Sequence, residues 1–134
     1  MGNSACEVSV TLKSFAIVAL HAAVGWALCG ATMGIGMAVT TLSNAMLAHL
    51  GAAPLFFIAI TWVYARRFAY TGPMQTALLF LAIVVVLDVF VAALLIQRSF
   101  AMFTSVAGVW LPLLLIGAAT YLTARLAGPR QPAA

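Results

Sequence analysis

The chain carries very little charge, and this scarcity excludes several classes of protein. Only 6% of its 134 residues are charged, and just two of them, Glu7 and Asp88, are acidic. A soluble globular protein has about 25% charged residues, so the composition excludes an ordinary soluble domain. The six basic residues stand singly or in one pair, which excludes the basic stripe of a nucleic-acid-binding protein.

Metal ligands and nucleophiles are equally scarce. The two cysteines, Cys6 and Cys29, are too few and too far apart for a disulfide framework or a zinc site. The two histidines, His21 and His49, are expected about 10 Å apart along the membrane normal, which argues against a haem held by both. The sequence contains no glycine-rich phosphate loop and no serine, histidine and acid trio. We therefore expect no metal, no cofactor and no enzymatic activity.

Long apolar runs make up most of the sequence. Hydrophobic residues account for 66% of the chain. The run from Pro73 to Ile96 contains a single charged residue, Asp88, and is long enough to cross a hydrocarbon layer of about 30 Å. Four such runs predict an all-α membrane protein with one domain, a bundle of four transmembrane helices. The predicted spans cover residues 12–37, 45–64, 73–96 and 103–122, and residues 127–134 are expected to form a disordered tail.

The basic residues orient the predicted bundle. If the chain starts inside and crosses four times, five basic residues fall on the inner side and only Arg98 falls outside. The inner five are Lys13, Arg66, Arg67, Arg125 and Arg130. Cytoplasmic loops carry an excess of lysine and arginine, so both ends are expected to be cytoplasmic. An aromatic belt is expected at the same interface, formed by Trp62, Tyr64, Tyr70 and Tyr121.

Two prolines and two glycines mark irregular or closely packed positions. Pro54 and Pro112 lie inside the second and fourth spans, where each removes a backbone donor and is expected to kink its helix. Gly30 and Gly34 lie one turn apart on the first span, so both expose backbone on one face and allow another helix to approach closely. That helix belongs either to the same bundle or to a second copy in a homodimer.

Asp88 is the leading candidate for a functional residue. A carboxylate at the centre of a membrane helix costs about 3 kcal/mol on insertion scales, so it should face the bundle and find a partner. His49, expected at a similar depth, is the first candidate, followed by the Trp110 indole and a snorkelling Arg98. These four residues form either a buried polar cluster that holds helices together or the proton-coupling groups of a small transporter.

Two segments resemble each other within the chain. PLFFIAITWVYAR at residues 54–66 and PLLLIGAATYLTAR at residues 112–125 share a proline, an apolar run, a tyrosine and a terminal Ala-Arg. Both predicted helices run from outside to inside, so a duplicated hairpin would give a parallel repeat. Chance similarity between apolar helices is the alternative.

More than half of the chain resembles a set of small bacterial four-helix inner-membrane proteins. The matching motifs include TGPMQTALLF, LDVFVAALLIQRSFAMF and GVWLPLLLIGAATYLT. The resemblance implies the same architecture in a bacterial inner membrane, and it implies no activity because none is assigned to that set. Small multidrug exporters have a similar length and span count, but their essential glutamate lies in the first helix, where this chain has no acid.

Two functions follow as expectations. The first is a structural or accessory membrane protein whose Asp88 is a buried group for helix packing. The alternative is a proton-linked small transporter that uses Asp88 and His49. The expected partners are the lipid bilayer and, through Gly30 and Gly34, further copies of the chain, and no nucleic acid is expected.

Overall fold

A computed structural model describes residues 12–68, 70–98, 104 and 106–127, and the regular structure in this part of the chain is entirely helical. The elements are α1 (Leu12–Val39), α2 (Leu42–Arg67), α3 (Pro73–Leu87), η1 (Asp88–Gln97), η3 (Val106–Trp110) and α4 (Leu111–Ala127). The prediction of an all-helical chain with four main helices is confirmed. Phe103, where the fourth span was expected to begin, and the predicted tail beyond Ala127 lie outside the described residues.

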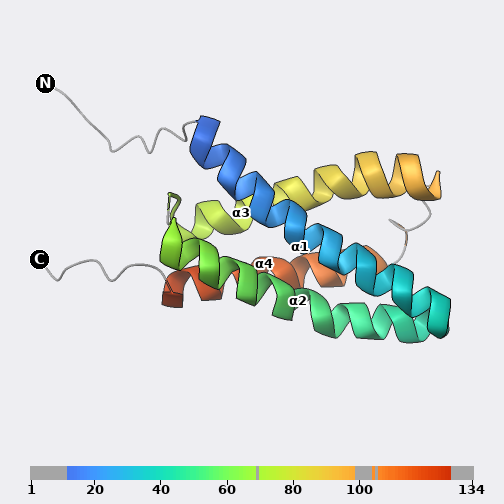
Figure 1. Cartoon of the computed structure of the whole chain (residues 1–134). Coiled ribbons are helices and arrows are strands. Elements are labelled where there is room, and N and C mark those ends of the chain that lie inside the picture. Colours follow the sequence, from blue (N-terminus) through green and yellow to red (C-terminus); the bar gives the residue numbers. More distant parts are fainter. Residues whose placement is uncertain (1–11, 69, 99–103, 105, 128–134) are drawn as a thin grey trace, which may run out of the picture.

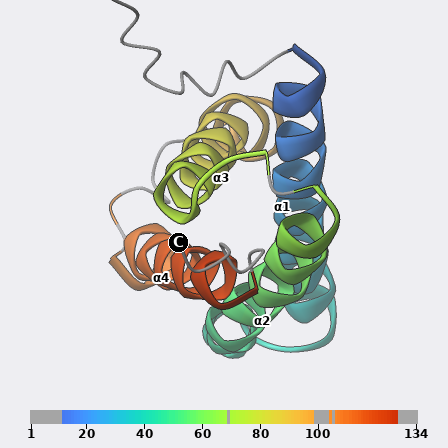
Figure 2. The same ribbon diagram turned by 90° about the vertical axis from the view of Figure 1, so that its left-hand side faces the viewer.

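The helices form two antiparallel hairpins that pack side by side (Figure 1). Viewed from one end, the helices follow one another around the bundle in the order α1, α2, α4, α3 (Figure 2). Thus α2 lies beside α4 and runs in the same direction, as α1 does beside α3. We call the end where α1 and α3 begin the basic end, because its helix termini carry Lys13, Arg66, Arg67 and Arg125. The opposite, far end contains the α1–α2 turn and Arg98.

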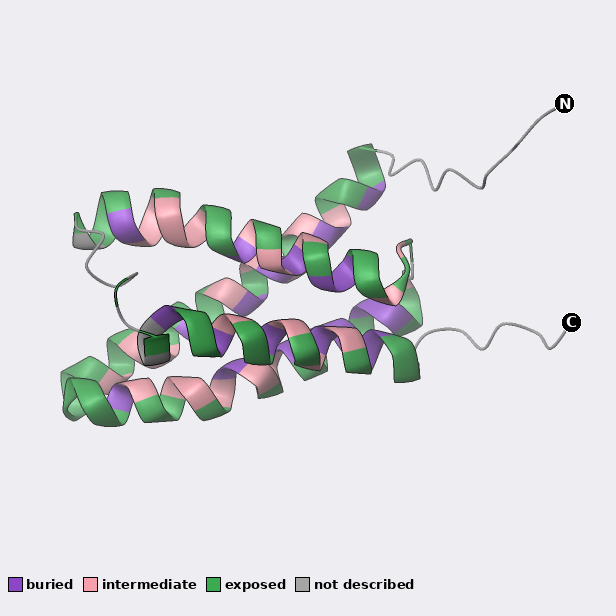
Figure 3. Ribbon diagram, turned by 180° about the vertical axis from the view of Figure 1, so that it is seen from behind, coloured by how far each residue is buried: buried purple, intermediate pink, exposed green. Residues whose placement is uncertain are grey.

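The outer surface of the bundle is apolar. Three helical stretches, Leu12–Val39, Leu42–Arg67 and Pro73–Ile96, are long and apolar enough to cross a membrane, with mean hydropathies of 1.7, 1.8 and 3.1. Few of their residues are buried, and Figure 3 shows exposed and half-buried residues along each of them. Such continuous apolar surface is typical of a protein surrounded by lipid. α4 has 17 residues and is shorter than each of these three stretches.

Local hydrogen bonds set the helix boundaries. Thr41 is the N-cap of α2, and its hydroxyl accepts a hydrogen bond from the Asn44 backbone amide at 3.3 Å. The Asn44 side-chain amide donates to the Thr40 hydroxyl at 3.0 Å, so the turn between α1 and α2 is stabilised by hydrogen bonds among its own residues. At the start of α3, Pro73 is the first helical residue, where its missing amide donor costs nothing.

The two prolines that were expected to kink helices lie in different settings. α2 continues through Pro54 as one helix from Leu42 to Arg67. Pro112 is the second residue of α4, directly after the short π-helix η3, so the fourth helical segment changes its hydrogen-bond register just before the proline. Pro112 donates no backbone hydrogen bond, so it interrupts the ladder close to this change of register.

A single apolar core runs through the bundle. Its buried members are Val18, Ala22, Cys29, Ala53, Phe57, Tyr64, Phe80, Val84 and Ile116. Tyr64 differs from the expected aromatic belt, because only 1% of its surface is exposed, whereas Trp62 is 46% exposed. Tyr64 is buried because its ring packs against Phe80 and its hydroxyl hydrogen-bonds Thr71 at 2.9 Å. It is therefore a core residue.

Candidate functional site

Asp88 is joined to the first helix by a hydrogen bond. The Trp26 indole Nε1 donates to the Asp88 carboxylate Oδ1 at 2.7 Å, linking α1 to the start of η1. Both side chains are partly buried. An indole has one donor and no acceptor, so this bond satisfies its polar capacity in full. The carboxylate keeps further acceptor capacity at Oδ2.

The surroundings of Asp88 are mostly apolar. Cys29 lies one turn beyond Trp26 on the same face of α1, is a free buried thiol, and is near enough to Asp88 to interact with its charge. Val84 lies one turn before Asp88 on α3 and belongs to the core. Asp88 is also the residue at which the helix changes from α to π hydrogen bonding. π-helical turns are frequent at functional sites.

The structure does not bring the other predicted polar residues to Asp88 by hydrogen bonds. His49 is partly buried on α2, and its Nδ1 has no hydrogen-bond partner among the described residues. Trp110 ends η3 and is half exposed. Arg98 is exposed and ends η1 in the left-handed conformation (φ 51°), and its backbone amide donates to the Ala93 carbonyl. The partner expected first, His49, is thus replaced by Trp26.

Depth along the bundle explains why Trp26, and not His49, is the partner of Asp88. Counted from the basic end at about 1.5 Å per residue, Trp26 lies about 21 Å along α1 and Asp88 about 22 Å along α3. His49 lies about 27 Å from the same end of α2, roughly one turn further out. The sequence was therefore sufficient to place Trp26 at the depth of Asp88. The hydrogen bond between them also requires α1 to lie beside α3.

The predicted glycine face is open in the single chain. An added Cβ at Gly30 or Gly34 would meet no atom within 4 Å, so neither glycine serves close packing inside the bundle. Gly25 does serve it, because a Cβ there would lie 2.7 Å from Cζ of Phe57. A dimer seam at Gly30 and Gly34 stays a prediction.

An apolar layer separates Asp88 from the basic end. It consists of Phe57, Phe80, Val84 and Ile116, which belong to the one buried core. The rings of Phe57 and Phe80 meet edge to face with centroids 6.0 Å apart. Because Val84 precedes Asp88 by one helical turn, a polar route from the basic end to Asp88 would have to cross this layer.

Buried hydroxyl groups gather between the apolar layer and the basic end. This hydroxyl layer consists of Ser14, Thr61, Tyr64, Thr76, Thr120 and Thr123, so each of the four main helices contributes. Thr76 donates to the Gly72 carbonyl at 2.9 Å and hydrogen-bonds Thr71 at 2.7 Å. The hydroxyls of Thr61 and Thr120, both fully buried, have no partner among the described residues. Sequence reasoning missed this layer because threonines are common in apolar helices.

The two similar segments occupy equivalent positions in α2 and α4. Four buried residues of α2 match four buried residues of α4 at one constant spacing in the sequence. The pairs are Phe57 with Ile116, Thr61 with Thr120, Tyr64 with Thr123, and Ala65 with Ala124. The outer faces also correspond: Arg66 lies over the Trp62 ring at 4.9 Å, and the Arg125 guanidinium donates to the Tyr121 hydroxyl at 3.5 Å.

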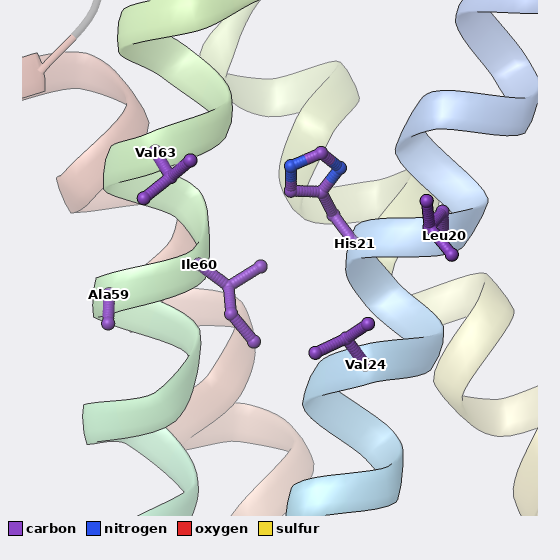
Figure 4. A pocket seen from close by; sticks show the side chains of 6 residues that line it. All are labelled: Leu20, His21, Val24, Ala59, Ile60 and Val63. Atoms are coloured by element: carbon purple, nitrogen blue, oxygen red, sulfur yellow. The ribbon is translucent and has the colours of Figure 1, made fainter.

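A groove of about 330 Å³ lies between α1 and α2, at about the depth of the hydroxyl layer and just beyond it. Its lining consists of Leu20, His21, Val24, Ala59, Ile60 and Val63 (Figure 4). His21 is the one polar lining residue. Its Nδ1 donates to the Ile17 carbonyl at 2.7 Å, and its ring makes T-shaped contacts with the rings of Tyr64 and Phe68.

The described histidine, cysteine and acidic side chains are spread over α1, α2 and η1. No group of three histidine, cysteine or acidic side chains there is close enough to hold a metal ion. His21 hydrogen-bonds its own helix and packs on aromatic rings, so its geometry is that of a packing residue.

Comparison with known proteins does not identify a family for this chain. No protein-family model, no curated protein and no solved structure matches the chain. The resemblance to small bacterial membrane proteins therefore rests on the sequence motifs alone, and the function has to be inferred from the geometry.

Proposed function

We propose that the chain is a multi-pass protein of the bacterial inner membrane with a structural or accessory role and no enzymatic activity, in which Asp88 fixes the packing of its helices. The hydrogen bond from Trp26 to Asp88 carries this proposal. It joins two helices far apart in the sequence, at one depth, in apolar surroundings where an unpaired carboxylate is expensive. The four-span arrangement with both ends in the cytoplasm belongs to the same proposal and is supported by the basic end.

A double-mutant cycle tests the packing role. Trp26→Phe removes the donor and keeps an aromatic ring, and Asp88→Ala removes the acceptor. We expect each to lower the free energy of unfolding in detergent micelles by about 1 to 3 kcal/mol, because a hydrogen bond to a charged group is lost. The double variant should be less destabilised than the sum, since both changes break one bond. Asp88→Asn retains an acceptor oxygen and serves as the matched control.

Additive effects would contradict the packing role. If Trp26→Phe and Asp88→Ala destabilise independently, their hydrogen bond contributes nothing to the fold. The same holds if Asp88→Asn is as damaging as Asp88→Ala, since the oxygen that accepts from the indole would then be irrelevant.

Proton-linked transport by Asp88 and His49 is the second candidate. It is favoured by the neutral donor on Asp88, which leaves the carboxylate without an ion-pair partner in the described part of the chain, and by the unpartnered buried Nδ1 of His49. Buried ionisable groups in membrane helices often mark proton relays. The apolar layer would then have to open for protons to pass between Asp88 and the basic end.

An infrared pH titration of the carboxyl band in reconstituted protein distinguishes the two candidates. Asp88→Asn assigns the band, and His49→Ala reports coupling. A coupling acid should change protonation between about pH 5 and 8 and respond to His49→Ala. A packing acid keeps one protonation state across that range, which would end the transport hypothesis.

A further inference from the structure

We propose that the groove between α1 and α2 binds one anionic phospholipid, with an acyl chain along its apolar lining and the phosphate at Lys13 and Arg67 of the basic end. The groove lies on the outer surface of the bundle: Leu20, Val24 and Val63 are 62%, 46% and 47% exposed. In a membrane, this surface faces lipid. A concave apolar surface that ends at cations differs from the rest of the lipid-facing surface in its shape and in its charge.

Each wall of the groove leads along one helix face to a cation. On α1, Lys13 is followed by Ile17, Leu20 and Val24 at steps of four, three and four residues. Residues three or four apart lie above one another on the same side of a helix, so Lys13 ends the line that forms this wall.

The α2 wall has the same organisation. Ile60 and Val63 line the groove, and Arg67 follows Val63 by four residues on the same face. Arg67 is exposed and makes no hydrogen bond, ion pair or ring contact with a described residue, whereas Arg66 lies over the Trp62 ring. Of these two neighbouring arginines, Arg67 thus has the free guanidinium, and its fork of donors suits phosphate oxygens.

The distances along the helices fit a phospholipid. Val63 lies about 6 Å and Ala59 about 12 Å from Arg67 along the helix axis. A phosphate held at Arg67 would place the first part of an acyl chain beside Val63 and the next part beside Ile60 and Ala59. Figure 4 shows Ile60 facing Val24 and His21 across the groove. The lining is otherwise apolar, as a hydrocarbon chain requires.

The equivalence of α2 and α4 supplies matched controls. Ala118 corresponds to Ala59, is exposed, and lies on α4 away from the groove lining. Arg125 corresponds to Arg66, but the position after it is Leu126, so the α4 face lacks the counterpart of Arg67.

Native mass spectrometry of the full chain in detergent tests the site, with dioleoyl phosphatidylglycerol as the anionic probe and dioleoyl phosphatidylcholine as the zwitterionic one. We expect one phosphatidylglycerol to be retained in preference to phosphatidylcholine. Arg67→Gln and Lys13→Gln should each weaken that binding about fivefold, the effect of one cation near a phosphate. Ala59→Trp should fill the groove and abolish the preference. Arg125→Gln and Ala118→Trp should leave it unchanged.

Three outcomes would overturn the proposal. They are equal retention of both lipids, equal effects of Arg67→Gln and Arg125→Gln, and full binding by Ala59→Trp. Glycerophosphate, which has no acyl chains, should not compete with phosphatidylglycerol. Competition by it would show that the site binds phosphate alone, against the proposal. The phosphatidylglycerol-dependent rise in melting temperature of the same variants repeats the test where a complex does not survive in the gas phase. Asp88→Asn should bind lipid normally, so this site and the proposed role of Asp88 fail independently.

Discussion

At the scale of single residues, Gly25 determines how closely α1 and α2 approach. Its missing side chain makes room for the Phe57 ring, whose atoms would lie 2.7 to 3.0 Å from an added Cβ. We expect Gly25→Ala to lower the free energy of unfolding by about 1 to 3 kcal/mol, because a rigid ring in a packed core must move. Gly30→Ala, where no atom lies within 4 Å, is the control in the same denaturant titration and should not destabilise. Equal stability of the two variants would show that Phe57 has room to shift.

The hydroxyl layer gives a second prediction about individual residues. Thr61 has a buried hydroxyl without a described partner, whereas the Thr76 hydroxyl has two. Valine has nearly the same shape, so Thr61→Val should raise the free energy of unfolding by about 1 kcal/mol and Thr76→Val should lower it by a similar amount. Chemical unfolding in micelles measures both. If Thr61→Val is as destabilising as Thr76→Val, the Thr61 hydroxyl is bonded in the folded protein.

The sequence indicated what Asp88 needs but not which residue supplies it. The cost of a charge among aliphatic neighbours predicted a buried partner, and that requirement is physical. The choice of Trp26 depends on α1 lying beside α3 and on both helices being rotated to bring the side chains together. A hydropathy pattern contains neither quantity, since large apolar side chains lie both in the core and on the outer surface of this chain.

At the scale of elements, η1 differs from the helix it continues. Of its residues with a described side chain, Ala93 alone is buried, whereas α3 buries Thr76, Ala77, Phe80 and Val84. Elements with few buried contacts open more readily. We expect the amides of η1 to exchange hydrogen for deuterium faster than those of α3 in micelles, as measured by mass spectrometry of peptides. Equal protection of the two segments would mean that another chain or lipid covers η1.

The helices themselves were predictable from composition, but their hydrogen-bond registers were not. Runs of aliphatic residues long enough to span a bilayer determine that α1, α2 and α3 exist. The change from α to π at Asp88 leaves no mark in a sequence such as VVVLDVFVAALL, because both registers place apolar side chains on the surface. Pro54 was placed correctly inside a helix, since α2 continues through it, and the kink expected there stays a prediction.

At the scale of the whole molecule, the open glycine face predicts how copies of the chain associate. Gly30 and Gly34 are exposed on α1 and meet no neighbour in the single chain. If they form a homodimer seam, Gly30→Ile should abolish the dimer in a cross-linking assay while leaving the monomer folded, because a large side chain separates the backbones. Gly51→Ile, also at an exposed glycine without neighbours, is the control on α2. Unchanged cross-linking of Gly30→Ile would exclude the seam.

The turn between α1 and α2 has a consequence for how the protein is made. Its hydrogen bonds are local, within residues 36–45: Thr40 donates its amide to the Gly36 carbonyl, and Asn44 donates to the hydroxyls of Thr40 and Thr41. The first hairpin therefore closes without help from α3 or α4. We expect this hairpin to be able to form while the rest of the chain is still being synthesised, with α3 and α4 packing against it afterwards.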